Sequence, residues 1–303
     1  MIRALAALAV VLAAVAAVQG SQAAFTASAQ NAGGAFATAS DWVAPAVTIA
    51  APASGASTND NTPSISGAAG NASGDSSTVT VRIYSGTSAT GTPVQTKTTT
   101  RLATAWGITA STLADGTYTV QASQADGSGN TGASAEVTFT VDTVAPTATA
   151  IAAANKGGAG TTAGKLDAGD TVTFTFSEAM APATILSGWN GSSTTVRVAF
   201  TNNSSNDSFT VLDSGGGTGV KLGTVTTGGN YVTATTTIAS STMARSADGK
   251  SIAVTLGTPS NVSSTAVTAK NMSWVLAAGP KDLAGNALAT PATRAETDTD
   301  VDF

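Results

Sequence analysis

The strongest constraint on the fold is a repeated alternation of apolar and polar residues in short segments. In one segment Val79, Val81 and Ile83 alternate with Thr80 and Arg82, so that every second side chain points to the same face of an extended strand. Clusters of Gly, Asn, Asp and Pro, which favour turns, separate the segments. We therefore expect an all-β chain in which each strand buries one face.

The hundred residues that follow Pro45 contain enough strands for one sandwich. Strands are expected at residues 47–50, 65–68, 79–85, 94–101, 105–108, 117–125 and 137–141. About seven short strands in about a hundred residues are typical of an immunoglobulin-like β-sandwich. Tyr118 follows the turn Asp115-Gly116 and fits the tyrosine corner of that fold, in which the hydroxyl group bonds to upstream backbone. Trp106 and Tyr118 are expected in the core, and an exposed aromatic platform for sugar is the alternative.

The remainder of the chain is also predicted to consist of strands. They are expected at residues 171–176, 195–200, 208–212, 231–237, 252–256 and 272–276. A single helical turn is expected at residues 182–186. Additional Gly and Thr between residues 202 and 248 predict an insertion or extra strands in this part.

The residues that the chain lacks exclude several chemistries. The 303 residues include no Cys and no His. Ser-His-Asp and Cys-His catalysis, His-metal sites, thiolate zinc sites and disulfides are therefore excluded. Charged residues make up 10% of the chain and the net charge is -5, without the basic stripe that nucleic acid binding requires.

The N-terminus has the order of a secretory signal peptide. Arg3 gives a basic start, residues 4–18 form an apolar run, and residues 19–24 are small and polar. We expect cleavage after Ala23 or Ala24, and an uncleaved N-terminal membrane anchor is the alternative. The following segment resembles the mature start of bacterial secreted proteins that are processed by an accessory type of signal peptidase. The matching positions are residues 24–28, Asn31, Gly33, Phe36 and residues 40–42.

Other segments resemble bacterial Ig-like families. In the first sandwich they are residues 54–60, 83–86, 115–120, 126–130 and 141–143. Residues 46–141 thereby resemble a bacterial Ig-like domain of the kind repeated in large surface proteins and adhesins. In the second part residues 174–180 and 282–286 resemble a related Ig-like family of surface-layer and cell-wall proteins. These resemblances imply an exported protein that acts in adhesion or matrix structure.

The predicted organisation has four parts. They are a signal peptide at residues 1–24, an N-terminal strand or linker at 25–44, an Ig-like β-sandwich at 45–144, and a second, enlarged Ig-like β-sandwich at 145–303 with an acidic C-terminal tail. Pro45 and Pro146 each follow Val-Ala, and we interpret them as equivalent starts of two tandem units. In the tail Glu296, Asp298, Asp300 and Asp302 alternate, and we expect them to be solvated.

Two sets of polar residues are candidates for Ca²⁺ at the ends of the units. Asp126, Asn130 and Asp142 lie in loops of the first unit that we expect near the joint, and Glu178, Asp282 and Asn286 form the second set. Oxygen ligands of this type suit Ca²⁺, although Asp and Asn also form turns by bonding to their own backbone. The sequence therefore leaves Ca²⁺ open, and it assigns no catalytic, cofactor-binding or metal-binding residue.

These observations predict a non-enzymatic protein, secreted or associated with the cell surface, that acts in structure or adhesion. Its expected partners are extracellular matrix, a cell-surface protein or a glycan. One alternative is a carbohydrate-binding accessory module, which an exposed row of aromatic residues would favour. Another is a fibre-forming matrix subunit, in which the aromatic segment 25–36 adds as a strand to a sheet edge of a neighbouring copy. A hydrolase with paired carboxylates is the third.

Overall fold

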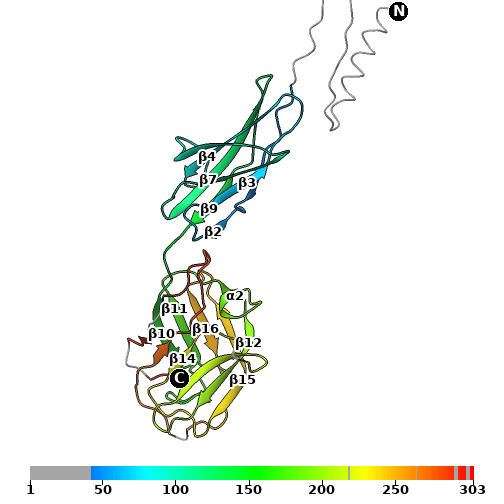
Figure 1. The fold of residues 1–303 in the computed structure, drawn as a ribbon. Helices are drawn as coiled ribbons and strands as arrows, with labels where there is room; N and C mark the ends of the chain where they lie inside the picture. The colour runs from blue at the N-terminus through cyan, green and yellow to red at the C-terminus, as the bar shows by residue number, and fades with distance from the viewer. Residues whose placement is uncertain (1–41, 218, 264, 290–292, 298–300) are drawn as a thin grey trace, which may run out of the picture.

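Two separate hydrophobic clusters organise the protein. Figure 1 shows two bodies of strands that follow one another along the chain. The computed structural model describes residues 42–217, 219–263, 265–289, 293–297 and 301–303. We call residues 42–143 the first unit and the residues from 144 onward the second unit. The predicted all-β class is confirmed. The predicted signal peptide and the segment 25–36 lie outside the described residues.

The first unit packs two sheets against each other. The smaller sheet contains, in spatial order, β1 (Thr48–Ala51), β3 (Ser64–Ala68) and β6 (Ala105–Thr109). The larger sheet contains, in spatial order, β2 (Ala56–Thr58), β9 (Val137–Val141), β7 (Gly116–Asp126), β4 (Asp75–Ser85) and β5 (Gln95–Thr100), with β8 (Thr131–Ala133) beside β7. All seven strands expected from the sequence are present. The strands β2 and β8 were not expected, because three residues are too few to display an alternation.

The aromatic residues of the first unit lie in its core, as expected. Trp106 and Tyr118 are buried, and the Tyr118 ring packs against Phe139 with 6.0 Å between ring centroids. The Tyr118 hydroxyl donates a hydrogen bond of 2.9 Å to the carbonyl oxygen of Ala114. Tyr118 therefore ties the turn before β7 to the strand, which is the contact that a tyrosine corner makes.

Substitution of Tyr118 should separate the contribution of the hydroxyl group from that of the ring. We expect Tyr118→Phe to lower the free energy of unfolding by about 1 kcal/mol, because one hydrogen bond is lost. Tyr118→Ala should cost about 3–5 kcal/mol, because it leaves a cavity beside Phe139. Urea denaturation of the mature protein measures both values. Equal stability of all three proteins would contradict a core position for this ring.

The second unit is built on one nine-stranded antiparallel sheet. In spatial order its strands are β10 (Ala148–Ala154), β11 (Thr171–Phe176), β16 (Ser251–Thr255), β15 (Thr236–Arg245), β12 (Thr194–Thr201), β13 (Ser208–Asp213), β14 (Thr224–Thr226), β17 (Ser273–Val275) and β18 (Thr293–Ala295). The one helical turn, α2 (Pro182–Ile185), lies where the sequence predicted it.

The sheet bends until its first and last strands come together. The guanidinium group of Arg294 in β18 donates two hydrogen bonds, of 3.1 and 2.7 Å, to the carbonyl oxygen of Ala148 in β10. The backbone N–H of Ala153 donates to the Glu296 carboxylate at 3.3 Å. Two charged side chains therefore occupy polar backbone groups at an edge that would otherwise be open to another strand.

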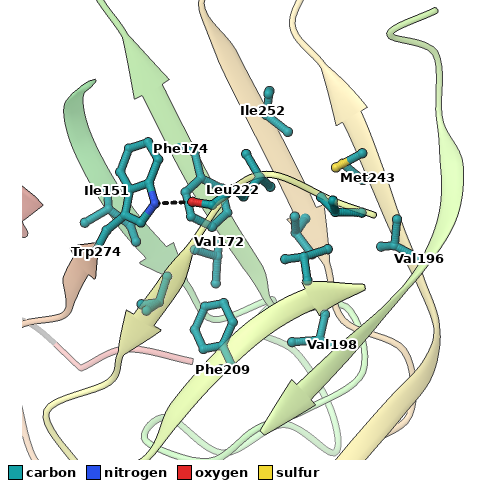
Figure 2. Close-up of a cluster of buried hydrophobic side chains, with 14 of the residues drawn as sticks. Ile151, Val172, Phe174, Val196, Val198, Phe209, Leu222, Met243, Ile252 and Trp274 are labelled. Carbon is teal, nitrogen blue, oxygen red and sulfur yellow. Dashed lines mark hydrogen bonds between the residues drawn. The ribbon is translucent and has the colours of Figure 1, made fainter. Parts of the chain in front are cut away.

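The inner face of this sheet carries a single core, part of which is drawn in Figure 2. Val172, Phe174 and Phe176 of β11 all point into it, as their alternation with threonine predicts. Trp274 meets Phe174 edge-on, with 4.9 Å between centroids, and its indole N–H donates to the carbonyl oxygen of Leu222. The strands therefore share one packed interior.

One expected strand was wrongly placed. Residues 231–237 were predicted as a strand, but β15 begins only at Thr236. The N–H groups of Tyr231 and Val232 instead donate to the buried Asp207 carboxylate at 2.7 and 2.8 Å. This carboxylate holds the segment as a loop, whatever its strand propensity. Between residues 202 and 248 the strand β13 matches the one expected at 208–212, and the extra strands are β14 and β15, of which only residues 236–237 fall within an expected strand.

The prediction that the acidic residues of the C-terminal tail are solvated is wrong for the two that the structure describes, Glu296 and Asp302. Glu296, Asp302 and Phe303 are buried, whereas Asp298 and Asp300 lie outside the described residues. The Phe303 ring packs edge-on against Tyr231, with 5.2 Å between centroids, and its carbonyl oxygen accepts a 2.7 Å hydrogen bond from the N–H of Gly164. Burial of the aromatic ring outweighs the acidic character of the preceding residues.

Removal of the Phe303 side chain should therefore destabilise the second unit. We expect Phe303→Ala to lower its free energy of unfolding by about 3–5 kcal/mol, because a fully buried ring is lost from the core. The exposed residue Val301 supplies the control, since Val301→Ala removes less buried surface from the same segment. Thermal unfolding followed by calorimetry gives both values. Equal effects of the two substitutions would place Phe303 outside the core.

Candidate functional site

The joint between the units brings together four of the six polar residues that the sequence indicated as Ca²⁺ candidates: Asp142, Glu178, Asp282 and Asn286. Two of the hydrogen bonds that cross it are accepted by backbone carbonyl groups. The backbone N–H of Asn59 donates to the carbonyl oxygen of Ala284 at 3.1 Å, and the side-chain amide of Asn286 donates to the carbonyl oxygen of Asp142 at 2.7 Å. The units therefore contact each other directly and are connected by more than the linker.

Three carboxylate groups gather at this joint. Asp142 comes directly after β9 of the first unit, Glu178 lies just beyond the end of β11, and Asp282 lies in a loop of the second unit. One carboxylate oxygen of each lies within 4.8 Å of one from each of the others. Asp282 is buried, and Asp142 and Glu178 are half-buried. Asp142 belongs to the first unit, whereas Glu178 and Asp282 belong to the second. The cluster therefore forms only when both units are in place.

The loop that carries Asp282 is held by its own side chain. One carboxylate oxygen of Asp282 accepts hydrogen bonds from the N–H groups of Gly285 and Asn286 at 2.6 and 2.9 Å. The other oxygen accepts from the side-chain amide of Asn286 at 2.8 Å. Gly285 has a φ of +101°, which a residue with a side chain rarely adopts. Asn286 is thereby positioned to reach Asp142 across the joint.

The environment of Glu178 changes its ionisation. Burial, the negative charges of Asp142 and Asp282, and a hydrogen bond shared with Asp142 together raise the pKa of Glu178 to about 7. Lys250 opposes this shift. A hydrogen bond between two carboxyl groups requires a proton on one of them. Near neutral pH the joint therefore needs a proton or another positive charge to compensate these carboxylates.

The first unit contains the same loop at another place. Asp126 accepts hydrogen bonds from the N–H groups of Ser128 and Asn130 at 2.9 and 2.8 Å and from the Asn130 side chain at 2.7 Å. The hydrogen bonds, chiefly that from the Asn130 side chain, lower the pKa of Asp126. The spacing Asp-x-x-Gly-Asn is thus repeated in the two units. The sequence displays this repeat at residues 126–130 and 282–286, although the two segments resemble different Ig-like families.

The expected grouping of Asp126 and Asn130 with Asp142 is wrong. Gly116, at the start of β7, pairs with Val141 beside the joint, whereas Asp126 ends the same eleven-residue strand. Eleven extended residues span roughly 30 Å, so the Asp126 loop lies at the opposite end of the first unit. Asp142 belongs instead with Glu178, Asp282 and Asn286, which the sequence grouped correctly.

The donor set at the joint fits a hard divalent cation. Ca²⁺ takes six to eight oxygen ligands and prefers carboxylates and carbonyls. Asp142, Glu178 and Asp282 offer carboxylate oxygens of high negative charge, and water would complete the shell. In the part of the chain that the structure describes, this is the one cluster of three or more acidic residues with such spacing.

The aromatic residues that the structure describes do not form a sugar-binding platform. Of those that the structure describes, all are buried except Trp42, which is 81% exposed.

Residues 127–132 have the spacing G-x-G-x-x-G that occurs in dinucleotide-binding sites. They are followed by the strand β9 and not by a helix, so this stretch is no dinucleotide site. No helix in the described ranges is long and apolar enough to cross a membrane.

Two packed sheets and a tyrosine corner define the first unit as an Ig-like sandwich. Residues 47–143 match the family model described as bacterial Ig-like domain, so the resemblance noted for residues 46–141 is confirmed. No curated protein matches the chain. The resemblance of the second unit to an Ig-like family, and that of the N-terminus to a secreted class, stay predictions.

Two solved structures align with much of the chain. The fibronectin(III)-like modules of CbhA from Clostridium thermocellum are 15% identical, with a TM-score of 0.26, over 82% of this chain and 92% of theirs. The BSP domain of a biofilm associated protein is 15% identical, with a TM-score of 0.21, over 84% of this chain and 29% of its own. Scores at this level carry no conclusion about function.

The raised pKa of Glu178 predicts a joint that responds to pH. A proton on Glu178 favours the docked joint, so this contribution is complete below the ordinary pKa of 4.5 and is lost as the pH rises through about 7. We expect the carboxyl carbon of Glu178 to titrate near pH 7 in an NMR experiment without divalent cations. The Asn59 amide, which bonds across the joint, should report the same midpoint.

The variant Glu178→Gln is the matched control for this titration. It keeps the size of the side chain and removes the ionisable group, so the Asn59 resonance should no longer follow pH in this range. A midpoint for Glu178 near 4.5, or an Asn59 response that persists in the variant, would contradict this account of the joint.

Proposed function

We propose that this is a non-enzymatic protein, secreted or surface-associated, that acts in adhesion or in the structure of an extracellular matrix. The observation that carries the proposal is the direct end-to-end joint, in which hydrogen bonds from Asn59 and Asn286 connect the two units. Such a joint holds the two units at a defined distance, which suits a spacer or display protein. The match of residues 47–143 to a bacterial Ig-like domain supports the same class.

The composition and the buried aromatic residues favour this role over the alternatives. Without His and Cys, an enzyme would depend on carboxylates, and the clustered ones sit at a contact between units. Carbohydrate binding through a row of exposed aromatic residues is disfavoured, because those described are buried apart from Trp42. We propose extracellular matrix, a cell-surface protein or a glycan as the partner.

We further propose that Ca²⁺ stiffens the joint outside the cell. Asp142, Glu178 and Asp282 would hold the ion, and its charge would replace the proton that these carboxylates otherwise require. Sites of this kind in extracellular modules bind in roughly the 10⁻⁴–10⁻³ M range. The joint would then be loose where Ca²⁺ is scarce and stiff where it is abundant.

Calcium titration tests the proposed ion site. At pH 7.5, Ca²⁺ at millimolar concentration should shift the Asn59 and Asn286 amide resonances of the wild-type protein, because both groups bond across the joint. The double variant Asp142→Asn, Glu178→Gln should lose this response. Asp126→Asn is the matched control, since it alters the equivalent loop at the far end of the first unit. An unresponsive wild type, or a double variant that still responds, would reject the ion site.

Localisation and attachment test the wider function. The producing cells should release the protein or carry it on their surface, so that protease added to intact cells removes it. Cells that lack the protein should attach less to surfaces or lose matrix cohesion. A purely internal protein, or unchanged attachment in cells without it, would overturn the proposal independently of the calcium result.

A further inference from the structure

The N-terminal end of the first unit is built like the end of the second unit that receives the first unit at the joint. The sequence Asp-x-Val-Ala-Pro occurs at residues 41–45 and again at residues 142–146. At both places the proline is buried, the three residues before it are exposed, and the second residue after it is buried. The chain therefore enters the two units in the same way.

The loop beside each entry is also the same. The backbone N–H of Asp126 donates to the carbonyl oxygen of Asn130 at 3.0 Å, and the N–H of Asp282 donates to the carbonyl oxygen of Asn286 at 3.1 Å. In both loops the aspartate carboxylate accepts from the backbone N–H and the side-chain amide of the asparagine. Each loop is therefore closed by one set of bonds, and we call it the connector loop.

The two connector loops differ in what covers them. At the joint Ala284 and Gly285 are half-buried, and a Cβ atom placed on Gly285 would lie 3.7 to 3.9 Å from three atoms of the Asn59 side chain. Their counterparts Ser128 and Gly129 are exposed. Within the described residues, no atom outside the adjoining chain lies within 4 Å of the same position on Gly129. The first connector loop thus leaves open a surface that the second one buries beneath another unit.

The end of the second unit opposite the joint does not offer the matching surface. The carbonyl group that Asn286 binds at the joint belongs to Asp142, the residue directly after β9, which is the last strand of the first unit. The corresponding carbonyl after β18, that of Glu296, accepts a 3.2 Å hydrogen bond from the Asn271 side chain of the same unit. A second copy of the chain is therefore disfavoured as the occupant of the first connector loop.

We propose that the N-terminal end of the first unit is a docking end for another Ig-like unit, which it receives as the second unit receives the first. The partner is a sandwich whose C-terminal end offers a backbone N–H after its second strand, as Asn59 does, and a carbonyl oxygen after its last strand, as Asp142 does. The carbonyl group of Ser128, in the position of Ala284, would accept that N–H. This inference rests on the proposed structural role and names a class of partner for it.

Docking at this end should depend little on Ca²⁺. β3 and β11 each pair with the first strand of their unit. Glu178 lies two residues after β11, whereas the residue two positions after β3 is Gly70. A partner that presents an aspartate in the position of Asp142 would therefore meet Asp126 without a third carboxylate. This difference separates the docking end from the ion site proposed above.

Disulfide cross-linking can test the docking end, because the chain has no cysteine of its own. The test protein is the full mature chain with one extra copy of residues 42–142 inserted after Asp41, so that a copied first unit precedes the original one through the same Asp-x-Val-Ala-Pro link. Asn59→Cys in the inserted copy and Ser128→Cys in the original unit should then form a disulfide under mild oxidation. The corresponding atoms at the joint, the Asn59 nitrogen and the Ala284 oxygen, are 3.1 Å apart, which brings the two residues close enough for a disulfide.

Two further pairs calibrate the reaction. Asn59→Cys with Ala284→Cys in the chain without the insert is the positive control, since these residues bond across the joint. Asn59→Cys in the inserted copy with Thr96→Cys, on the exposed side of β5 in the original unit, measures random encounters. Small-angle X-ray scattering of the extended chain without cysteines is an independent measurement, and it should show three units in fixed relative positions.

Matched variants make the test specific to the connector loop. In the extended chain Asn130→Ala of the original first unit should slow cross-linking at the new contact about fivefold, as loss of one neutral hydrogen bond implies. It should leave cross-linking at the joint unchanged. Asn286→Ala should have the reverse effect, because its amide bonds to Asp142 across the joint. Removal of Ca²⁺ with a chelator should leave the new contact unchanged.

Several results would overturn the inference. They are cross-linking at the new contact no faster than that of the Thr96 pair, scattering that shows a freely moving extra unit, or an Asn130→Ala variant that behaves like the parent. Self-association of the chain without the insert that is lost in Asn130→Ala would make a second copy the occupant and would also reject the proposal. None of these results bears on surface localisation or attachment, which test the proposed function separately.

Discussion

Carboxylate groups that accept hydrogen bonds from backbone N–H groups hold the loops of this protein in place. Asp126 and Asp282 do so in the two copies of one loop, and the buried Asp170 and Asp207 do so at the far end of the second unit. A chain without cysteine cannot hold its loops with disulfides, and these internal bonds take over that task. The joint depends on them, since it requires Asn286 to be held in place by Asp282.

The sequence predicted those parts of the fold that follow from local alternation. In strands such as β4 and β11 every second residue is apolar and buried, and this alternation can be read from the sequence. The corner position of Tyr118 could be predicted from the turn before it. The three-residue strands β2 and β14 lack that signal, because their place is set by the neighbours with which they pair. The segment 231–235 was misplaced since Asp207, more than twenty residues earlier, overrides its strand propensity.

The candidate site could be predicted only in part for the same reason. The spacing of Asp282 and Asn286 identifies a self-bonded loop, but nothing local indicates that this loop faces Asp142 of the other unit. The end of a strand at which a residue lies depends on strand direction, which is why Asp126 was assigned to the wrong end. Likewise, Phe303 shows no periodic pattern with its acidic neighbours, and only the packing against Tyr231 explains its burial.

The closure of the nine-stranded sheet has a consequence for the order of folding. Arg294 bonds to Ala148, which lies 146 residues earlier, so the first strand of the second unit meets its edge partner only after the intervening chain has been placed. Contacts of such long sequence separation form slowly, because the loop entropy is lost before the contact is gained. In a chain made from its N-terminus, the local contacts of the first unit form early, while the second unit stays open until residues beyond 293 arrive. During that interval β10 exposes an unpaired edge, and the speed of synthesis then decides how long the edge remains open to other chains.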